Sequence, residues 1–295
     1  MKLRVWAAVA AVSGLAACGG GGGGGGGSGG PSGGGSSTGS DISAANYLSF
    51  AGPIVRAASG RHEGVSTLSE LLNGRILSTN CAISGTRRFT VTDPDNNGQL
   101  STGDSVTTVW ENCVDTSGAS PMTGQIKEDL MSLVRAGGGA ITSYEYKTTF
   151  TDARPAGAGL LNGTLVATYT IASTSQVYKL DYQQLSVVEP GRSRIVYDYT
   201  VDGEAGPGFS RLALKGTLSF DEQRYTFETD PQVPLQYAGN PTPSSGVLRI
   251  SDAAGDSMRF SVLSASATTA EFVPAGQTAA AQSTPMTWPQ ALALP

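Results

Sequence analysis

The stretch Arg211-Leu212-Ala213-Leu214-Lys215-Gly216-Thr217-Leu218-Ser219-Phe220 alternates apolar and polar side chains along its length. In an extended chain, one face would carry the apolar set and the other face the polar set. The apolar set is Leu212, Leu214, Leu218 and Phe220, and the polar set is Arg211, Lys215, Thr217 and Ser219. A period of two predicts a β-strand with one face on a core and one in water, which is typical of antiparallel sheets.

The same alternation recurs along most of the chain from residue 75 onward. Turn sequences rich in Gly, Pro and Asp separate most of these runs. The other runs are residues 87–92, 106–110, 124–133, 143–151, 164–171, 178–182, 194–202, 225–228, 247–250, 258–263 and 269–273. About a dozen short strands predict an all-β fold: an antiparallel meander, a sandwich or an open barrel. Two runs open with the same Gly-Thr-Leu sequence, at Gly163 and Gly216, which hints at a repeated hairpin unit.

Helical signals are confined to residues 41–73, near the N-terminal end of the predicted domain. Residues 46–50 can form a short turn, which we expect Gly52-Pro53 to disrupt. Thr67 and Glu70 have the spacing of a capping box, and Asn73-Gly74 supplies a stop signal. Residues 231–245 are rich in Pro, Asn, Ser and Gly, which fits a long loop or a subdomain boundary within the domain 41–295.

Residues 1–17 have the features of a secretory signal peptide: Lys2 and Arg4, then a short apolar run that ends in small residues. The stretch Leu15-Ala16-Ala17-Cys18 resembles a bacterial lipobox. The resemblance implies that Cys18 becomes the first residue of the mature protein and carries acyl chains such as palmitate. Two or three acyl chains would hold the protein stably on a membrane, outside the cytoplasm. Gly19 after Cys18 is compatible with sorting to the outer membrane of the bacterial envelope.

Residues 18–40 follow as a tether made almost entirely of Gly and Ser, with an expected reach of roughly 25 Å. Removal of the signal leaves 17 Lys and Arg against 24 Asp and Glu, a net charge of −7. An acidic protein without a basic cluster is not expected to bind nucleic acid.

Cys81 and Cys113 form the one pair that is left once Cys18 is lipidated. Outside the cytoplasm such a pair is expected to form a disulfide, the alternative being two buried free thiols. A bridge across about 30 residues would stabilise the domain by roughly 3–4 kcal/mol on the chain-entropy account.

Residues 93–104 have the spacing of oxygen ligands that a hard divalent cation requires. The stretch resembles an EF-hand calcium loop, with Gly98 at the sharp turn and Leu100 at the position that packs inward. The resemblance implies ligands at Asp93, Asp95, Asn97, Gln99 through its carbonyl, Ser101 through water, and Asp104. Calcium bound there would be structural and weak, with a dissociation constant of about 10⁻⁴–10⁻³ M.

Two features depart from that family. Asp104 stands where the family has a bidentate Glu, and the β-branched residues on both sides predict flanking strands rather than helices. The loop would then lie at a hairpin tip whose base is pinned by Cys81 and Cys113. The alternative is a metal-free turn, because Asp-Pro-Asp-Asn-Asn-Gly is good turn chemistry by itself.

A catalytic signature is absent from the sequence. His62 is the single histidine, which argues against a Ser-His-Asp triad and a His-rich zinc site. Glu128-Asp129 and Asp221-Glu222 are adjacent acids that would point to opposite faces of a strand, as solvated surface charges. We therefore expect a non-catalytic lipoprotein that binds a partner or plays a structural role. A carrier of an apolar or lipidic ligand in a half-barrel is the alternative, and a carboxylate-based hydrolase is the least favoured.

Overall fold

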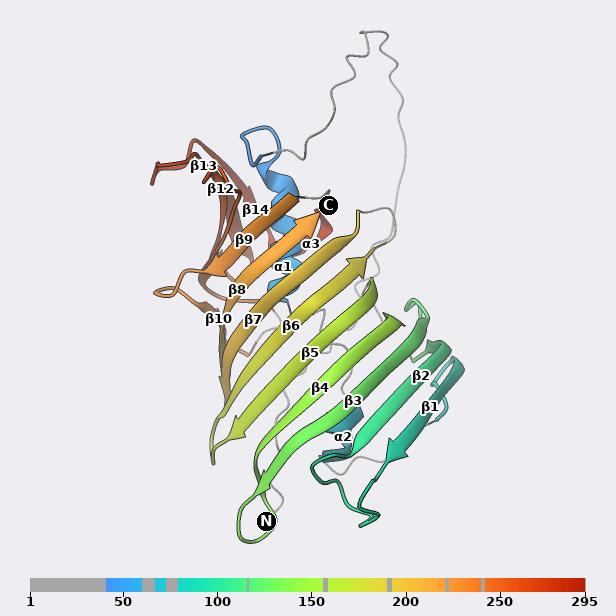
Figure 1. Cartoon of the computed structure of the whole chain (residues 1–295). Coiled ribbons are helices and arrows are strands. Elements are labelled where there is room, and N and C mark those ends of the chain that lie inside the picture. Colours follow the sequence, from blue (N-terminus) through green and yellow to red (C-terminus); the bar gives the residue numbers. More distant parts are fainter. Residues whose placement is uncertain are drawn as a thin grey trace.

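A computed structural model describes residues 41–59, 67–72, 79–115, 117–155, 159–189, 193–220, 223–239 and 242–294 of the chain. Within these residues, antiparallel strands form one 14-stranded sheet (Figure 1). The strands are β1 (Ser84–Thr92), β2 (Ser105–Val114), β3 (Met122–Arg135), β4 (Ile141–Arg154), β5 (Leu160–Ile171), β6 (Gln176–Val188), β7 (Ile195–Gly206), β8 (Phe209–Phe220), β9 (Gln223–Thr229), β10 (Leu235–Tyr237), β11 (Gly246–Ser251), β12 (Ser257–Ser264), β13 (Ala267–Val273) and β14 (Gln282–Met286).

The strand order follows the sequence from β1 to β9 and continues through β11 to β14. The short strand β10, which the sequence did not predict, pairs with β8 beside this path. The prediction of an all-β antiparallel fold is confirmed, and among the three predicted architectures the structure is an open meander. Residues 231–245 contain β10, while β9 and β11 pair directly with each other.

Charged side chains cover the outer face of the sheet, opposite the helices. A single register row across the sheet carries Asp129, Lys147, Asp181, Lys215, Glu228, Arg249, Arg259 and Glu271. Arg249 and Arg259 lie directly opposite each other, and each has a glutamate on its other side. Arg259 pairs with Glu271 at 2.8 Å. The signs alternate along the row except at Arg249 and Arg259, where the flanking glutamates offset the like-charge repulsion.

Four short helical segments lie on the inner face: η1 (Tyr47–Phe50), α1 (Ala51–Ala58), α2 (Thr67–Leu72) and α3 (Trp288–Ala293). The expectation that Gly52-Pro53 would disrupt the first of them was wrong, because α1 begins there. Pro53 lies in the first turn of α1, where a backbone N–H has no partner within the helix. The helix predicted around Thr67 is confirmed as α2, whereas its predicted stop at Asn73 lies outside the described residues. None of the described helices is long and apolar enough to cross a membrane.

All eight residues of α1 are buried, in contact with η1 and α3 and with side chains of the inner face of the sheet such as Tyr197. In η1, just before it, Phe50 packs on Phe220 and Tyr225, with ring centroids 5.4 and 4.9 Å apart. Helix α3 closes the same side, where Trp288 meets Phe260 edge-on at 5.7 Å. Figure 1 shows α1 and α3 together, within the curve of strands β7 to β14. The core of this half of the sheet is therefore built from segments at both ends of the domain.

Helix α3 was not predicted, although the sequence contains a capping box and a proline at its start. Thr287 and Gln290 form a reciprocal capping box, with Pro289 in the first turn. At six residues, α3 is too short to be stable without tertiary contacts. Its stability comes from the burial of Trp288 and Ala291.

A row of bulges bends the first six strands. Three non-glycine residues with positive φ occupy it on alternate strands, and each faces a glycine of the preceding strand. These pairs are Asn112 with Gly85, Asp152 with Gly124, and Gln184 with Gly163. A Cβ on any of the three glycines would overlap the backbone of its partner. The repeated close approach requires glycine on the odd strands and accentuates the local bend of the sheet.

Polar clasps hold two of these bulges. The N–H of Asp152 donates to Asn162 Oδ1 at 2.9 Å, and Asn162 Nδ2 donates back to Asp152 at 3.0 Å. Likewise the N–H and the carboxamide of Gln184 donate to the two carboxylate oxygens of Asp198, at 2.7 and 2.8 Å. Gly216, which shares its Gly-Thr-Leu sequence with Gly163, also lies where a Cβ would overlap the neighbouring strand. The shared sequence therefore marks two sites of close approach between strands.

Replacement of Gly124 by Ala should lower the free energy of unfolding by about 3 kcal/mol, because it adds steric overlap to the strain of a positive φ. Gly118→Ala is the matched control: φ is +78° there, but nothing lies within 4 Å of the added Cβ. That variant should lose only about 1 kcal/mol. Urea unfolding of both variants gives the comparison, and equal losses would show that the close approach at the bulge does not matter.

Candidate functional site

The loop between β1 and β2, residues 93–104, turns sharply with the help of three left-handed residues. Asn96, Gly98 and Gly103 have φ values of 53°, 69° and 99°. Asparagine tolerates this conformation better than most side chains, and glycine adopts it without strain. The strands on both sides confirm the prediction that helices do not flank this loop.

Carboxylate side chains turn inward and accept hydrogen bonds from the loop. Asp93 accepts from the N–H groups of Asn97 and Gly98, at 3.3 and 2.8 Å. Asp95 accepts from the carboxamide of Asn97 at 2.7 Å and from the hydroxyl of Ser101 at 3.0 Å. Asp104 accepts from the N–H of Ser101 at 2.8 Å. The loop is thus organised around acidic oxygens.

Three carboxylates meet at the centre of this arrangement. Asp93, Asp95 and Asp104 each place one oxygen within 4.8 Å of the other two. Asp104 is buried, Asp93 is half-buried and Asp95 is exposed, so the cluster opens toward solvent on one side. Such a concentration of negative charge is favourable around a divalent cation and repulsive without one.

The other predicted ligands lie close by. Asn97 and Ser101 both donate hydrogen bonds to Asp95, so they belong to the same cluster. The N–H of Gln99 donates to Asn97 Oδ1 at 2.6 Å. Its carbonyl as a metal ligand stays a prediction. Leu100 packs against the hydrophobic core, as the resemblance to the EF-hand loop implies for its eighth position.

The loop favours the ionised form of its central acid. A hydrogen bond that Asp93 donates when its carboxyl carries a proton lowers the pKa of Asp95, and weaker bonds from Ser101 and Asn97 add to this, against an opposing effect of burial. A carboxyl with a lowered pKa in the folded state contributes stability above its unfolded pKa and loses it as the pH falls through the folded pKa. At neutral pH, Asp95 is therefore available as an anionic ligand.

The end of the loop is fixed to the third strand. The N–H of Gly103 donates to the carbonyl of Leu130, and the N–H of Leu130 donates to the carbonyl of Asp104, both at 2.8 Å. Thr102 Oγ1 accepts from the N–H of Leu133 at 3.1 Å. These contacts position Asp104 relative to the sheet, so the candidate ligands are held by the fold and not only by the turn.

At the other end of the hairpin, Cys81 and Cys113 form the predicted disulfide. Their Cα atoms are 5.4 Å apart and they are separated by 32 positions in sequence. Asp115 ties the same end, since it accepts from the N–H of Ala82 at 3.0 Å and pairs with Arg87 at 3.5 Å. Most of β1 is exposed, so the disulfide and the loop contacts clamp a strand that has little core packing of its own.

Glu128 is buried, so the prediction that it is a solvated surface charge was wrong. It is 1% exposed on the inner face, where it accepts from the N–H of Leu68 in α2 at 2.9 Å. Its neighbour Asp129 points to the outer face and pairs with Lys127 at 2.7 Å. The opposite directions of the two acids are as predicted. The burial of Glu128 depends on α2 lying above it, which strand periodicity does not reveal.

Cys18, His62 and Asp221-Glu222 lie outside the described residues. No protein-family model, curated protein or solved structure matches this chain.

The unreduced, denatured protein should show no free thiol at Cys81 or Cys113. Reduction should lower the melting temperature by about 10 °C, because a loop of this length contributes about 3–4 kcal/mol in a domain of this size. The double variant Cys81→Ala, Cys113→Ala is the control, since a reductant should leave its melting temperature unchanged. Quantitative labelling of both cysteines without reductant would contradict the bridge.

Proposed function

We propose that this protein is an extracytoplasmic lipoprotein of the bacterial envelope, anchored in the outer membrane through Cys18. Its β-domain acts without catalysis, as a binding or structural module carried on the Gly- and Ser-rich tether. The support for the anchor is the sequence Leu15-Ala16-Ala17-Cys18 after a short apolar run. The disulfide between Cys81 and Cys113 fits an oxidising compartment.

A structural calcium site in the β1–β2 loop is the second part of the proposal. The observation that carries it is the convergence of Asp93, Asp95 and Asp104, one oxygen each within 4.8 Å. Calcium accepts irregular shells of six to eight oxygens, so carboxylates, the Asn97 carboxamide, a carbonyl and water can share it. The bound ion would neutralise the repulsion and stiffen the tip of an exposed edge hairpin.

The two alternatives gain no support from a particular observation. A carrier needs an apolar cavity, and the inner face between β8 and β13 is packed with η1, α1 and α3. A carboxylate-based hydrolase needs two acids that share a cleft. Glu128 and Asp129 lie on opposite faces of β3.

Millimolar calcium should raise the melting temperature of the protein by a few degrees. At about ten times the dissociation constant, binding to the folded state alone contributes about 1.4 kcal/mol. The shift should be smaller with magnesium, which requires near-octahedral geometry. Differential scanning calorimetry with each ion measures both effects.

The double variant Asp93→Asn, Asp95→Asn should lose the calcium shift while it keeps the shape of the loop side chains. The matched control is Asp181→Asn with Asp202→Asn, which removes the same charge from the outer face and should respond like the wild type. If the two double variants respond equally to calcium, ionic screening explains the shift and the metal site is wrong.

Cys18→Ser should release the protein from membranes or leave it as an unprocessed precursor. Fractionation of cells after a carbonate wash measures this. The variant Cys81→Ser, Cys113→Ser is the control, because it removes the other two cysteines and should stay with the membranes. Retention of Cys18→Ser in the washed membranes would disprove the lipid anchor.

A further inference from the structure

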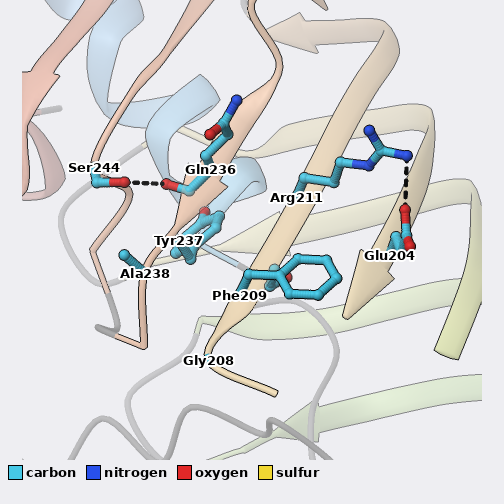
Figure 2. A pocket seen from close by; sticks show the side chains of 9 residues that line it. Glu204, Gly208, Phe209, Arg211, Gln236, Tyr237, Ala238 and Ser244 are labelled. Carbon is cyan, nitrogen blue, oxygen red and sulfur yellow. Dashed lines mark hydrogen bonds and ion pairs between the residues drawn. The ribbon is translucent and has the colours of Figure 1, made fainter. Parts of the chain in front are cut away.

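A surface hollow of about 450 Å³ lies at the end of the β7–β8 hairpin, beside β10 (Figure 2). The residues that give it chemical character are Glu204, Phe209, Arg211, Gln236 and Ser244. The hollow is remote in sequence from the β1–β2 loop, and the inference drawn from it does not depend on the calcium site.

An aromatic ring forms one wall of this hollow. Phe209 follows the turn Pro207-Gly208 directly. Gly208 has a φ of 78°, and a turn with a positive φ at its second central residue favours glycine there. The ring lies over Gly206, its partner across the hairpin, where a Cβ would overlap it. Phe209 is nevertheless 44% exposed. The main chain of Gly206 thus supports the ring of Phe209, which remains open to solvent and forms an apolar platform.

Planar polar groups lie next to the platform. Glu204, Arg211 and Gln236 occupy one register row across β7, β8 and β10. Arg211 and Glu204 pair at 2.7 Å, with 62% and 28% of their side chains exposed. A carboxylate, a guanidinium and a carboxamide together offer several donors and acceptors. Their charges cancel, since Glu204 neutralises Arg211.

Three other ligand classes fit this hollow poorly. The exposed outer side of β10 is already paired, because Ser244 N–H donates to the carbonyl of Gln236 and Gln236 N–H donates to Ser245, at 2.7 and 3.0 Å. An extended peptide therefore finds no free strand edge there. An anionic ligand is disfavoured because Glu204 already neutralises Arg211. A lipid chain would stay largely wet against one aromatic ring in an open hollow.

We infer that this hollow binds a neutral saccharide. The apolar C–H face of a sugar ring would lie on Phe209, and its hydroxyls would bond to Glu204, Arg211 and Gln236. A hydroxyl both donates and accepts, so it matches a mixed set of charged and amide groups whose net charge is zero. A sugar ring stacks well on an exposed aromatic ring that is supported from behind and has polar groups at its edge.

The test uses the full-length protein in detergent with a panel of neutral oligosaccharides of glucose, mannose, galactose and N-acetylglucosamine. Saturation-transfer NMR and calorimetry should detect binding of at least one of them, with a dissociation constant of about 10⁻³ M or tighter. Phe209→Ala should weaken that binding by about tenfold or more. Phe209→Tyr keeps the platform and should retain it.

Leu263→Ala is the control, since Leu263 is 66% exposed on another strand and should leave binding unchanged. Unchanged melting temperatures would show that the Phe209 variants are folded. The inference fails if no neutral oligosaccharide binds at about ten times that concentration. It also fails if Phe209→Ala binds as well as the wild type, or if only charged saccharides or peptides bind.

Discussion

Burial of helix α1 against the inner face of the sheet is the contact on which the described fold depends. The apolar face of a wide sheet must be covered by other segments. Here helical segments before the first strand and after the last one pack on it. Arg56 of α1 is 2% exposed and donates to the carbonyl of Leu294 at 2.8 Å, with Glu189 of the β6 end 3.6 Å away. Tyr197 and Tyr237 add hydrogen bonds to the carbonyls of Pro53 and Ala58. One helix thereby joins the two ends of the domain to the middle of the sheet.

The bulge row gives the first six strands a curvature of their own. Gly85, Gly124 and Gly163 let the neighbouring backbone approach closely at Asn112, Asp152 and Gln184. The carboxylate of Asp198 accepts the backbone N–H of Gln184, which the strand ladder leaves unpaired at the bulge. Because the same bulge recurs on alternate strands, the sheet bends along a line across β1 to β6, whereas η1 and α3 pack on the other half of the sheet, against Phe220, Tyr225 and Phe260.

The two candidate sites lie at hairpin turns, where the fold leaves side chains free for chemistry. In the β1–β2 loop the acids face one another, and the proposed cation would relieve their repulsion. At the β7–β8 turn Glu204 and Arg211 are already paired, and the ring of Phe209 lies exposed beside them. The difference in charge balance is the reason that one site is assigned to a metal ion and the other to a neutral ligand.

Alternation, cysteine count and loop spacing are local or combinatorial signals, so the sequence predicted most of the strands, the disulfide and the spacing of the acids in residues 93–104, but not the strands β10 and β14. It also contained the signals of α3, a capping box and a proline, but these become decisive only when Trp288 is buried. Only the packing of distant segments places Pro53 in the first turn of a buried helix, Glu128 under α2, and the strands in one open meander. It also places Phe209, Arg211 and Gln236 together. Those outcomes depend on which distant segments cover a face or pair side by side, and such pairings leave no periodic trace in a single sequence.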